Sequence, residues 1–533
     1  MPDPVNVLLI GGGGREHAIA WKLAQSPRLG TLYTTHPENP GITACGARPV
    51  DVPVSTREIY RLQQFCDRNR IGLVVIGPED PLADGWADKL AAPGRLIFGP
   101  SQSAARLESD KAWCKQMLRT GAIPTGGASI FTDPESARNY VETRAAAGLS
   151  PEELRDLDIR DRVQRINHII ERIPAIVTRA PEHERVALTI SCVHAAAANE
   201  RDPELRRKMI AELRRTNRLI ARAYDAPISD LPVIKASGLA KGKGVILPRT
   251  LAEAIDAIDQ IMVRRVFSDA GATVIIEEKL EGREVSVLAL VDGRTICVLP
   301  PCQDHKRLLD DDEGPNTGGM GAYCPSNSID EPTMARIERE ILVPIVDTLR
   351  REGIEFRGVL YAGLMLTHAG PKVLEFNTRF GDPECQPLMM RLDSDLLELM
   401  LATASGTLDQ ADVRWKNDAA CCVVIASPGY PDKPENGIPI HGVNELAAGP
   451  LSQSGELVVF QAGTKRDADA ALATAGGRVL GVTALGHDLA QARERAYAAC
   501  EKISFKGMHY RRDIGLTESM TLNSETSRGS TPA

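Results

Sequence analysis

Short apolar runs rich in valine, isoleucine and leucine recur along the first hundred residues, and most of them end at glycine or proline. They read VNVLLIGGGG, TLYTT, IGLVVIGPE and RLIFGPS, and stretches of helix length separate them. Buried strands that alternate with helical segments are typical of a parallel sheet with crossover helices. The pattern therefore predicts an α/β, Rossmann-like domain over residues 1–108.

Two further groups of strand-like runs follow. The second group contains VIKASGLAKGKGVIL, TVIIEEKLEGREVSVLALV, YAGLMLT and KVLEFN, and it predicts a central domain over residues 109–410. The third contains CCVVIASPGYP, LVVFQAGTK and GGRVLGVTALGHD, followed by the helical pattern DLAQARERAYAACEKI. We expect a smaller α+β domain at 411–516 and a disordered, Ser/Thr-rich tail at 517–533.

Residues 144–230 break this alternation. The segment has few β-branched runs, balanced acidic and basic residues, and apolar positions at helical spacing such as Leu205, Met209 and Leu213. It is predicted to be an inserted helical unit. A surface addition with amphipathic helices is the first interpretation, and because the charges cancel, a nucleic-acid-binding arm is disfavoured.

Composition narrows the classes of function. The chain has 533 residues, 43% of them hydrophobic and 25% charged, which is ordinary for a globular protein of about three or four domains. A net charge of −8 gives no basic footprint for nucleic acid. No apolar window is long enough to span a membrane, and the N-terminus lacks a basic region, so we expect a cytoplasmic protein without nucleic-acid or membrane partners. The 11 scattered cysteines form no CxxC pair, which favours reduced thiols over zinc or disulfides.

Two glycine-rich stretches follow predicted strands and suit phosphate. GGGGREHAIA opens a helix, whose backbone N–H groups hold anions well, but Glu16 stands where a dinucleotide fingerprint has glycine. KASGLAKGKGV adds lysines, and its spacing does not match the common P-loop. Phosphate binding without a dinucleotide is the hypothesis; a plain tight turn and a solvated loop are the alternatives.

Polar residues also gather in three later stretches. IIEEKLEGREVSV carries carboxylates that suit an adenosine, although charged hairpin residues usually face solvent. DHKR at 304–307 and GPNTGGMGAY at 314–323 form a Gly-rich loop that no core requires. In KVLEFNTRFGDPE, strand alternation predicts Glu375, Asn377 and Arg379 on one face. Glu375 and Asn377 offer hard oxygen ligands for Mg²⁺, and the alternative is a polar edge strand paired with lysines.

Taken in order, GGGGREHA, GPEDPL, GLAKGKGV, IIEEKLEG, QDHKR, GPNTGGMGAY, LYAGLM, LEFNTRFGDPE, FQAGTK, GGRVLGVTALG and YRRDIG resemble the phosphoribosylamine–glycine ligase (glycinamide ribonucleotide synthetase) family of the ATP-grasp superfamily. The resemblance covers nearly the whole chain except residues 144–230 and the tail. It implies an ATP-grasp body with a small lid at about 123–143 and 231–285, on which the insertion would ride. It also implies that ATP activates glycine as an acyl phosphate, which 5-phosphoribosylamine then converts to an amide in purine synthesis.

The resemblance also assigns roles to residues. The expected catalytic residues are Arg379, Lys306 and Asp304, and the expected ligands of Mg²⁺ or Mn²⁺ are Glu375 and Asn377. The expected ATP contacts are Lys111, Lys235, Gly242, Lys243, Gly244, Glu277, Leu280 and Glu284. The expected contacts to glycine and phosphoribosylamine are Gly13, Gly14, Arg15, Glu79, Asn316, Thr317, Gly318, Gly319, Met320 and Asp382.

The chain departs from the family pattern at two places. Ser237 and Lys241 replace the aspartate and alanine of KADGLAAGKGV, and PENPG at 37–41 replaces PGNAG. Two rival functions therefore stay open: another ATP-grasp carboxylate–amine ligase, and a non-catalytic ATP-binding homologue. The sequence leaves a monomer and a homodimer equally open.

Overall fold

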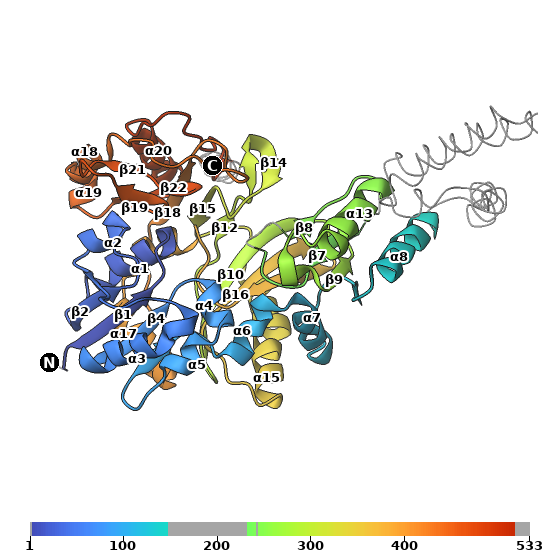
Figure 1. Cartoon of the computed structure of the whole chain (residues 1–533). Coiled ribbons are helices and arrows are strands. Elements are labelled where there is room, and N and C mark those ends of the chain that lie inside the picture. Colours follow the sequence, from blue (N-terminus) through green and yellow to red (C-terminus); the bar gives the residue numbers. More distant parts are fainter. Residues whose placement is uncertain (1–2, 148–231, 241–243, 517–533) are drawn as a thin grey trace, which may run out of the picture. The chain divides into compact units, whose positions relative to one another are not determined.

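The computed structural model describes residues 3–147, 232–240 and 244–516, which form two compact units (Figure 1). The first unit holds residues 3–126 and 280–516, and the second holds 127–147, 232–240 and 244–279. The predicted insertion, apart from residues 144–147, and the predicted disordered tail lie outside the described residues.

The first unit begins with the parallel sheet that the sequence predicts. Its strand order is β3-β2-β1-β4-β5. The strands are β1 (Val5–Ile10), β2 (Leu29–Thr34), β3 (Arg48–Pro49), β4 (Ile71–Ile76) and β5 (Leu96–Phe98). The helices that follow are α1 (Gly14–Leu23), α2 (Pro40–Ala44), α3 (Ile59–Arg68), α4 (Glu79–Ala83), α5 (Trp86–Leu90), α6 (Gln102–Ser109) and α7 (Lys111–Thr120).

Both faces of this sheet are covered, which explains its continuous apolar strands. Val7 and Leu9 of β1 pack with α1, whereas Leu8 and Ile10 on the opposite face belong to a separate cluster with α3. A helix layer on each face leaves the carboxyl ends of the strands as the place for loops with binding residues.

A central antiparallel sheet follows, with strand order β11-β10-β16-β17. Its strands are β10 (Arg283–Asp292), β11 (Ile296–Val298), β16 (Arg357–Thr367) and β17 (Gly370–Asn377). The helices around it are α14 (Glu331–Ile337), α15 (Val343–Arg351), α16 (Cys385–Arg391) and α17 (Leu396–Ser405). Val287 and Leu360 pack on α15, while Leu288 and Val359 face a second cluster that includes α16 and α17.

The third sheet of this unit has the order β12-β15-β18-β22-β19. Its strands are β12 (Gln303–Asp304), β15 (Gly321–Cys324), β18 (Ala419–Ala426), β19 (Leu457–Gln461) and β22 (Arg478–Gly486). Two small ribbons pair β13 (Arg307–Leu309) with β14 (Glu313–Asn316), and β20 (Thr464–Arg466) with β21 (Leu472–Thr474). The helices are α18 (Val443–Ala447), α19 (Pro450–Gln453) and α20 (Leu489–Cys500), the last as predicted.

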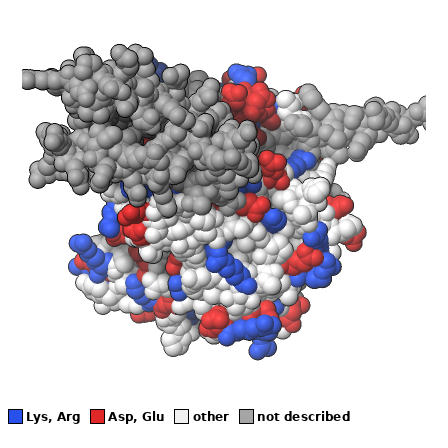
Figure 2. Space-filling view, turned by 90° about the vertical axis from the view of Figure 1, so that its right-hand side faces the viewer, with Lys and Arg blue, Asp and Glu red and all other residues white. Residues whose placement is uncertain are grey.

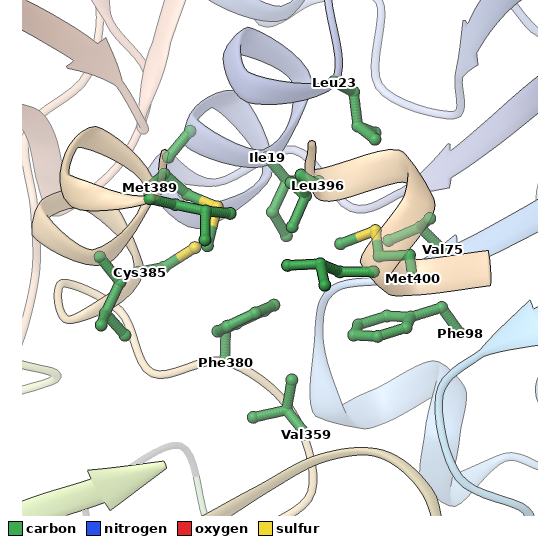
Figure 3. Close-up of a cluster of buried hydrophobic side chains, with 14 of the residues drawn as sticks. Ile19, Leu23, Val75, Phe98, Val359, Phe380, Cys385, Met389, Leu396 and Met400 are labelled. Atoms are coloured by element: carbon green, nitrogen blue, oxygen red, sulfur yellow. The ribbon is translucent and has the colours of Figure 1, made fainter. Parts of the chain in front are cut away.

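One hydrophobic cluster ties the parallel sheet to the central sheet through α16 and α17 (Figure 3). Phe98 at the end of β5 stacks on Phe380, with ring centroids 6.2 Å apart. Ile19, Val359 and Met400 also belong to this cluster and are at most 1% exposed. Because Phe380 is anchored in this core, the polar residues on either side of it in the turn after β17 are fixed in place.

The described part of the second unit contains a four-stranded antiparallel sheet and the helices that pack on it. Its strand order is β6-β9-β7-β8, with β6 (Ala128–Phe131), β7 (Val233–Ala236), β8 (Val245–Ile246) and β9 (Val274–Glu277). Helices α8 (Pro134–Ala147) and α13 (Leu251–Ile258) share its core through residues such as Ala137, Ile234 and Ile258. This sheet displays the predicted nucleotide residues of LPVIKASG and TVIIEEK.

The distribution of charge on the surface and the state of the cysteines match what the composition predicts. On the face that Figure 2 shows, positive and negative side chains are interspersed, without a large patch of one sign among the described residues. All the described cysteines are free thiols, as predicted. None of the described helices combines the length and apolarity of a membrane span.

Candidate active site

The central sheet has a polar face next to its edge strand β17. The strand register places Glu375 opposite Gly363 and Asn377 opposite Tyr361. Directly opposed residues of an antiparallel pair share a face, so Glu375, Asn377 and Tyr361 project on the same side. Phe376, between the two predicted metal ligands, enters the hydrophobic core on the other side. The predicted alternation is therefore present at these two positions.

The alternation does not extend to Arg379, and this part of the expectation is wrong. Strand β17 ends at Asn377, because the next amide, of Thr378, donates to Glu108 Oε2 (2.8 Å) on helix α6 and not to a neighbouring strand. Arg379 lies beyond this stop, where its guanidinium contacts Glu108 Oε1 at 2.8 Å and Glu79 Oε2 at 3.4 Å.

The buried carboxylate of Glu108 and the half-buried carboxylate of Glu79 thus flank one guanidinium. Burial would raise the pKa of Glu79, but Arg379 and Arg15 lower it overall, whereas burial dominates at Glu108 and raises its pKa. Burial would also lower the pKa of Arg379, and the two carboxylates raise it. This arrangement keeps Arg379 positively charged and holds it in one position.

Lys306 brings three predicted residues together over the polar sheet face. Its ammonium contacts the carboxylate of Glu284 on β10 and lies 3.7 Å from Glu375 Oε1. Burial would lower the pKa of Lys306, but Glu284 and Glu375 raise it well above its ordinary value. A predicted catalytic cation, a predicted ATP contact and a predicted metal ligand therefore form one charged group.

Asp304 lies beside this group at the end of β12. Its Oδ1 is buried and accepts no hydrogen bond in the described part of the chain. Burial, followed by the nearby Glu384, raises the pKa of the Asp304 carboxyl well above its usual range. Glu384 is 2% exposed and accepts a hydrogen bond from Ser286 Oγ (3.3 Å). Asp304, the carboxyl among the three predicted catalytic residues, thus has one oxygen that can accept a hydrogen bond from a substrate.

The donors at Glu375 and Asn377 fit a divalent cation that arrives with phosphates. They supply one carboxylate and one amide oxygen from a single strand face, which suits Mg²⁺, an ion usually held by one or two carboxylates plus substrate phosphates and water. Among the described residues no group of three or more His, Cys, Asp or Glu side chains is placed to hold a metal without such help.

The predicted Gly-rich loop, residues 316–320, lies against Lys306 and Asp304. Thr317 donates from both its amide (2.7 Å) and its hydroxyl (2.8 Å) to the Lys306 carbonyl. Gly319 has φ +111°, and a Cβ there would lie 2.8 Å from Asp304 Oδ1 and 2.5 Å from Pro383 Cδ. Only glycine fits between these two segments, and Met320 anchors the loop in the core with 0% exposure.

The backbone amides of the N-terminal glycines are not all available to bind a phosphate. Gly13 caps helix α1, but its amide donates to Glu16 Oε2 at 2.6 Å. Arg15 is 7% exposed, and its Nε pairs with Glu16 while its Nη1 donates to the Phe380 carbonyl at 3.0 Å. Glu16, which breaks the dinucleotide fingerprint, therefore satisfies a backbone donor that a dinucleotide phosphate would need. Gly14 begins the helix and faces Asp382.

A cavity of about 340 Å³ opens next to this helix start. It is lined by Gly12, Gly13, Asn39, Asp382, Thr464 and Arg478, among others. Asn39 caps α2 through Gly41 and donates from Nδ2 to the carbonyls of Gly12 (2.8 Å) and Gln461 (2.9 Å). The PENPG segment, which departs from the family pattern, keeps this asparagine, and Glu38 from the same segment also lines the cavity.

Sequence reasoning did not select Arg478, Glu384, Glu108 or Asn39 as site residues. Each acts through a contact to a distant segment: Arg478 Nη2 lies 3.1 Å from Asp382 Oδ2, for example. Arg478 and Asp382 belong to motifs that the family resemblance includes, so those motifs were the available signal. The pairing itself is a tertiary contact that no local pattern reports.

The remaining predicted ATP contacts lie on both units. In the second unit, Lys235 on β7 pairs with Glu277 on β9, with 2.7 Å between Nζ and Oε2, and both are buried. Gly244 accepts a hydrogen bond from the Ala236 amide (2.8 Å). In the first unit, Lys111 begins α7 and Leu280 leads into β10. Gly242 and Lys243 lie outside the described residues.

Comparisons with known proteins agree with this arrangement. The phosphoribosylglycinamide synthetase N domain matches residues 5–108, the ATP-grasp (A) domain matches 206–385 and the C domain matches 420–517. A phosphoribosylamine–glycine ligase of Rhodopirellula baltica is 40% identical over 510 residues, which cover 96% of this chain and 97% of the relative. The same enzyme of Caulobacter vibrioides is 39% identical, with coverages of 96% and 98%.

Two solved structures share the fold of this chain. The phosphoribosylamine–glycine ligase of Thermotoga maritima has a TM-score of 0.69 and 28% identity, over 96% of this chain and 100% of that one. A biotin carboxylase of Campylobacter jejuni has a TM-score of 0.61 at 12% identity, over 96% of this chain and 94% of its own, which shows the shared fold. The three domain matches and the full-length relatives together show that this chain belongs to the phosphoribosylglycinamide synthetase family, with an ATP-grasp central domain.

Proposed function

We propose that this chain is an ATP-dependent carbon–nitrogen ligase that joins glycine to 5-phosphoribosylamine and releases ADP and phosphate. The observation that carries the proposal is the match, in order, of all three family domains, together with relatives of about 40% identity that are named for this activity. The product would be glycinamide ribonucleotide, made in the cytoplasm during purine synthesis.

The reaction would proceed in two steps. A glycine carboxylate oxygen attacks the γ-phosphorus of ATP, the bond to the β,γ-bridging oxygen breaks, and ADP leaves. The amine of phosphoribosylamine then attacks the carbonyl carbon of glycyl phosphate, forms the C–N bond and expels phosphate. One amine proton must be removed, and the unbonded Oδ1 of Asp304 is the candidate acceptor. Burial, followed by Glu384, raises the pKa of this carboxyl, which makes its carboxylate form a stronger base.

Charge neutralisation is the main requirement of a phosphoryl transfer between anions. Lys306 and Arg379 would supply positive charge near the reacting groups, and their carboxylate neighbours hold both in place. Glu375 and Asn377 would hold Mg²⁺ or Mn²⁺, which when bound neutralises phosphate charge. The loop at 316–320 and Asp382 would contact glycine and phosphoribosylamine, with the cavity at Gly13 open to the sugar phosphate. The expected substrate contacts Gly14, Arg15 and Glu79 would lie on the same side of the site as this cavity.

ATP would contact Lys111, Lys235, the Gly242–Gly244 segment, Glu277, Leu280 and Glu284. The chemistry of these groups supports the proposal: lysines suit phosphate oxygens, and carboxylates accept hydrogen bonds from an adenine amino group or ribose hydroxyls.

An assay that omits one substrate at a time tests this function. Purified protein is mixed with MgATP, glycine and freshly generated phosphoribosylamine, and ADP and glycinamide ribonucleotide are both measured. We expect both products only when all three substrates are present. Phosphate release with a different carboxylate or amine in place of these substrates would identify another ATP-grasp ligase. Tight ATP binding without any turnover would identify a non-catalytic homologue.

Lys235→Met should weaken ATP binding. The change removes a charge-assisted contact worth about 1.5–3 kcal/mol, so the Kd for ATP should rise about ten- to hundredfold. Arg138→Met is the matched control, because Arg138 pairs with Asp259 in the same unit (Nε to Oδ1, 2.9 Å) and no nucleotide role is proposed for it. Calorimetric titration measures both constants. Equal Kd values for the two variants would contradict the assignment.

A further inference from the structure

Arg478, the first residue of β22, contacts three backbone carbonyls and one carboxylate across the site. Its Nη1 donates to Gly318 O (2.5 Å), to Gly319 O (3.5 Å) and to the carbonyl of Asp382. Its Nη2 lies 3.1 Å from Asp382 Oδ2. One guanidinium therefore joins the 316–320 loop to the turn that carries Asp382.

Both backbone polar atoms of Gly318, its amide and its carbonyl, make hydrogen bonds that hold the loop in place. The Gly318 amide donates to the Tyr430 hydroxyl at 3.0 Å, while its carbonyl accepts from Arg478. A Cβ on Gly318 would lie 3.0 Å from Arg478 Cζ, so the loop packs directly on the guanidinium. The loop thus contacts Arg478 through Gly318, and at Gly319 it lies so close to Asp304 that a Cβ would come within 2.8 Å of Oδ1.

The same guanidinium also sets the charge and position of Asp382. Burial would raise the pKa of Asp382, but Arg478, followed by Arg15, lowers it overall. Gln386 Nε2 donates to the other oxygen, Oδ1, at 2.7 Å. Both carboxylate oxygens are therefore oriented, and Arg478 and Asp382 together line the cavity beside Gly13.

We propose that Arg478 is a positioning residue that couples the phosphoribosylamine cavity to the glycine-binding loop, so that the acyl phosphate forms next to a correctly placed amine. The inference deepens the proposed function and rests on it for its kinetic part. The planar fork matters because Nη1 serves carbonyls on both segments while Nη2, held in a fixed orientation to it, serves the carboxylate; a flexible ammonium lacks this fixed geometry. The loop and the turn, which lie 160 and 96 residues before Arg478 in the chain, would thereby respond together to the occupant of the cavity.

The test compares Arg478→Met and Arg478→Lys with Arg495→Met. Arg495 is the matched control, since it also joins a carbonyl, Leu485 O (2.7 Å), to a carboxylate, Glu456 Oε1 (3.1 Å), outside the cavity. In Arg478→Met we expect kcat/KM for phosphoribosylamine to fall about thirtyfold or more, as misplacement of reacting groups does, with KM for ATP within about twofold. ADP should form in excess of glycinamide ribonucleotide, and Arg478→Lys should recover only part of the loss.

A second measurement is independent of the activity. Amide hydrogen exchange should be faster at Gly318–Met320 in Arg478→Met and in Arg478→Lys than in the parent protein, and unchanged there in Arg495→Met. Unchanged exchange in both Arg478 variants would overturn the inference, and so would a tight one-to-one ratio of ADP to product in Arg478→Met. A parent protein that makes no glycinamide ribonucleotide would refute the proposed function alone, because the exchange data would still show whether Arg478 holds the loop.

Discussion

Glu375→Gln should lower turnover by about a hundredfold or more at moderate Mg²⁺ concentration. The substitution keeps the shape of the side chain but removes the negative charge that would attract the cation. Each tenfold loss corresponds to about 1.4 kcal/mol of barrier, and the electrostatic contribution of a metal exceeds two such steps. Raising the Mg²⁺ concentration should restore part of the rate if the defect lies in metal affinity.

The structure indicates that Glu375→Gln should not disturb folding, so a loss of turnover can be assigned to the site. Lys306 keeps its contact to Glu284 when Glu375 loses its charge, so no buried cation is left unpaired. Glu398→Gln is the matched control, because Glu398 pairs with Arg28 at 2.7 Å on an exposed surface, where such a pair contributes under about 1 kcal/mol. Steady-state rates across a Mg²⁺ series, with a melting curve for each variant, test the assignment. Turnover of Glu375→Gln within about threefold of the parent would rule out a metal role.

Patterns of period two and of strand–helix alternation predicted most of the architecture. The runs VNVLLI, IGLVVI and CCVVIA became β1, β4 and β18, because each is apolar, β-branched and bounded by turn residues. The same alternation predicted that Glu375 and Asn377 share a face. The domain limits near residues 108 and 410 and the limits of the lid stay predictions.

The contacts that complete the site could not be read from local patterns. The expected row of three polar residues failed at Arg379 because Glu108, about 270 residues earlier in the chain, takes the amide that would have continued the strand. Likewise Gly13 looked like a free anion donor, although Glu16 of the same helix accepts its hydrogen bond. Local periodicity reports which face a side chain takes; it does not report which distant group satisfies a buried polar atom.

The second large effect is expected on stability, at the group formed by Arg379, Glu79 and Glu108. Arg379→Met should destabilise the protein by about 3 kcal/mol, because it leaves the buried Glu108 and the half-buried Glu79 near each other without their shared cation. Arg350→Met is the matched control: Arg350 is 63% exposed, and its partner Asp347 keeps a second arginine, Arg351. That change should stay under about 1 kcal/mol.

The stability deficit of Arg379→Met should also depend on pH. Without the guanidinium, the folded-state pKa of both carboxyls should rise, although Arg15 still acts on each, so the deficit of the variant shrinks as pH falls and these groups take up protons. In the parent, Arg379 and Arg15 hold the pKa of Glu79 below its usual value despite burial, so that contribution is present above the ordinary carboxyl pKa and is lost as pH falls. Glu108, whose parent pKa is already raised by burial, acts in the opposite direction and therefore moderates the parent's loss. The Tm difference between parent and variant should consequently be largest near neutral pH and smaller near pH 4 to 5, a range set by the ordinary Glu pKa of about 4.3. A difference that is constant across this range would show that Arg379 stabilises the fold by packing and not by pairing with these two carboxylates.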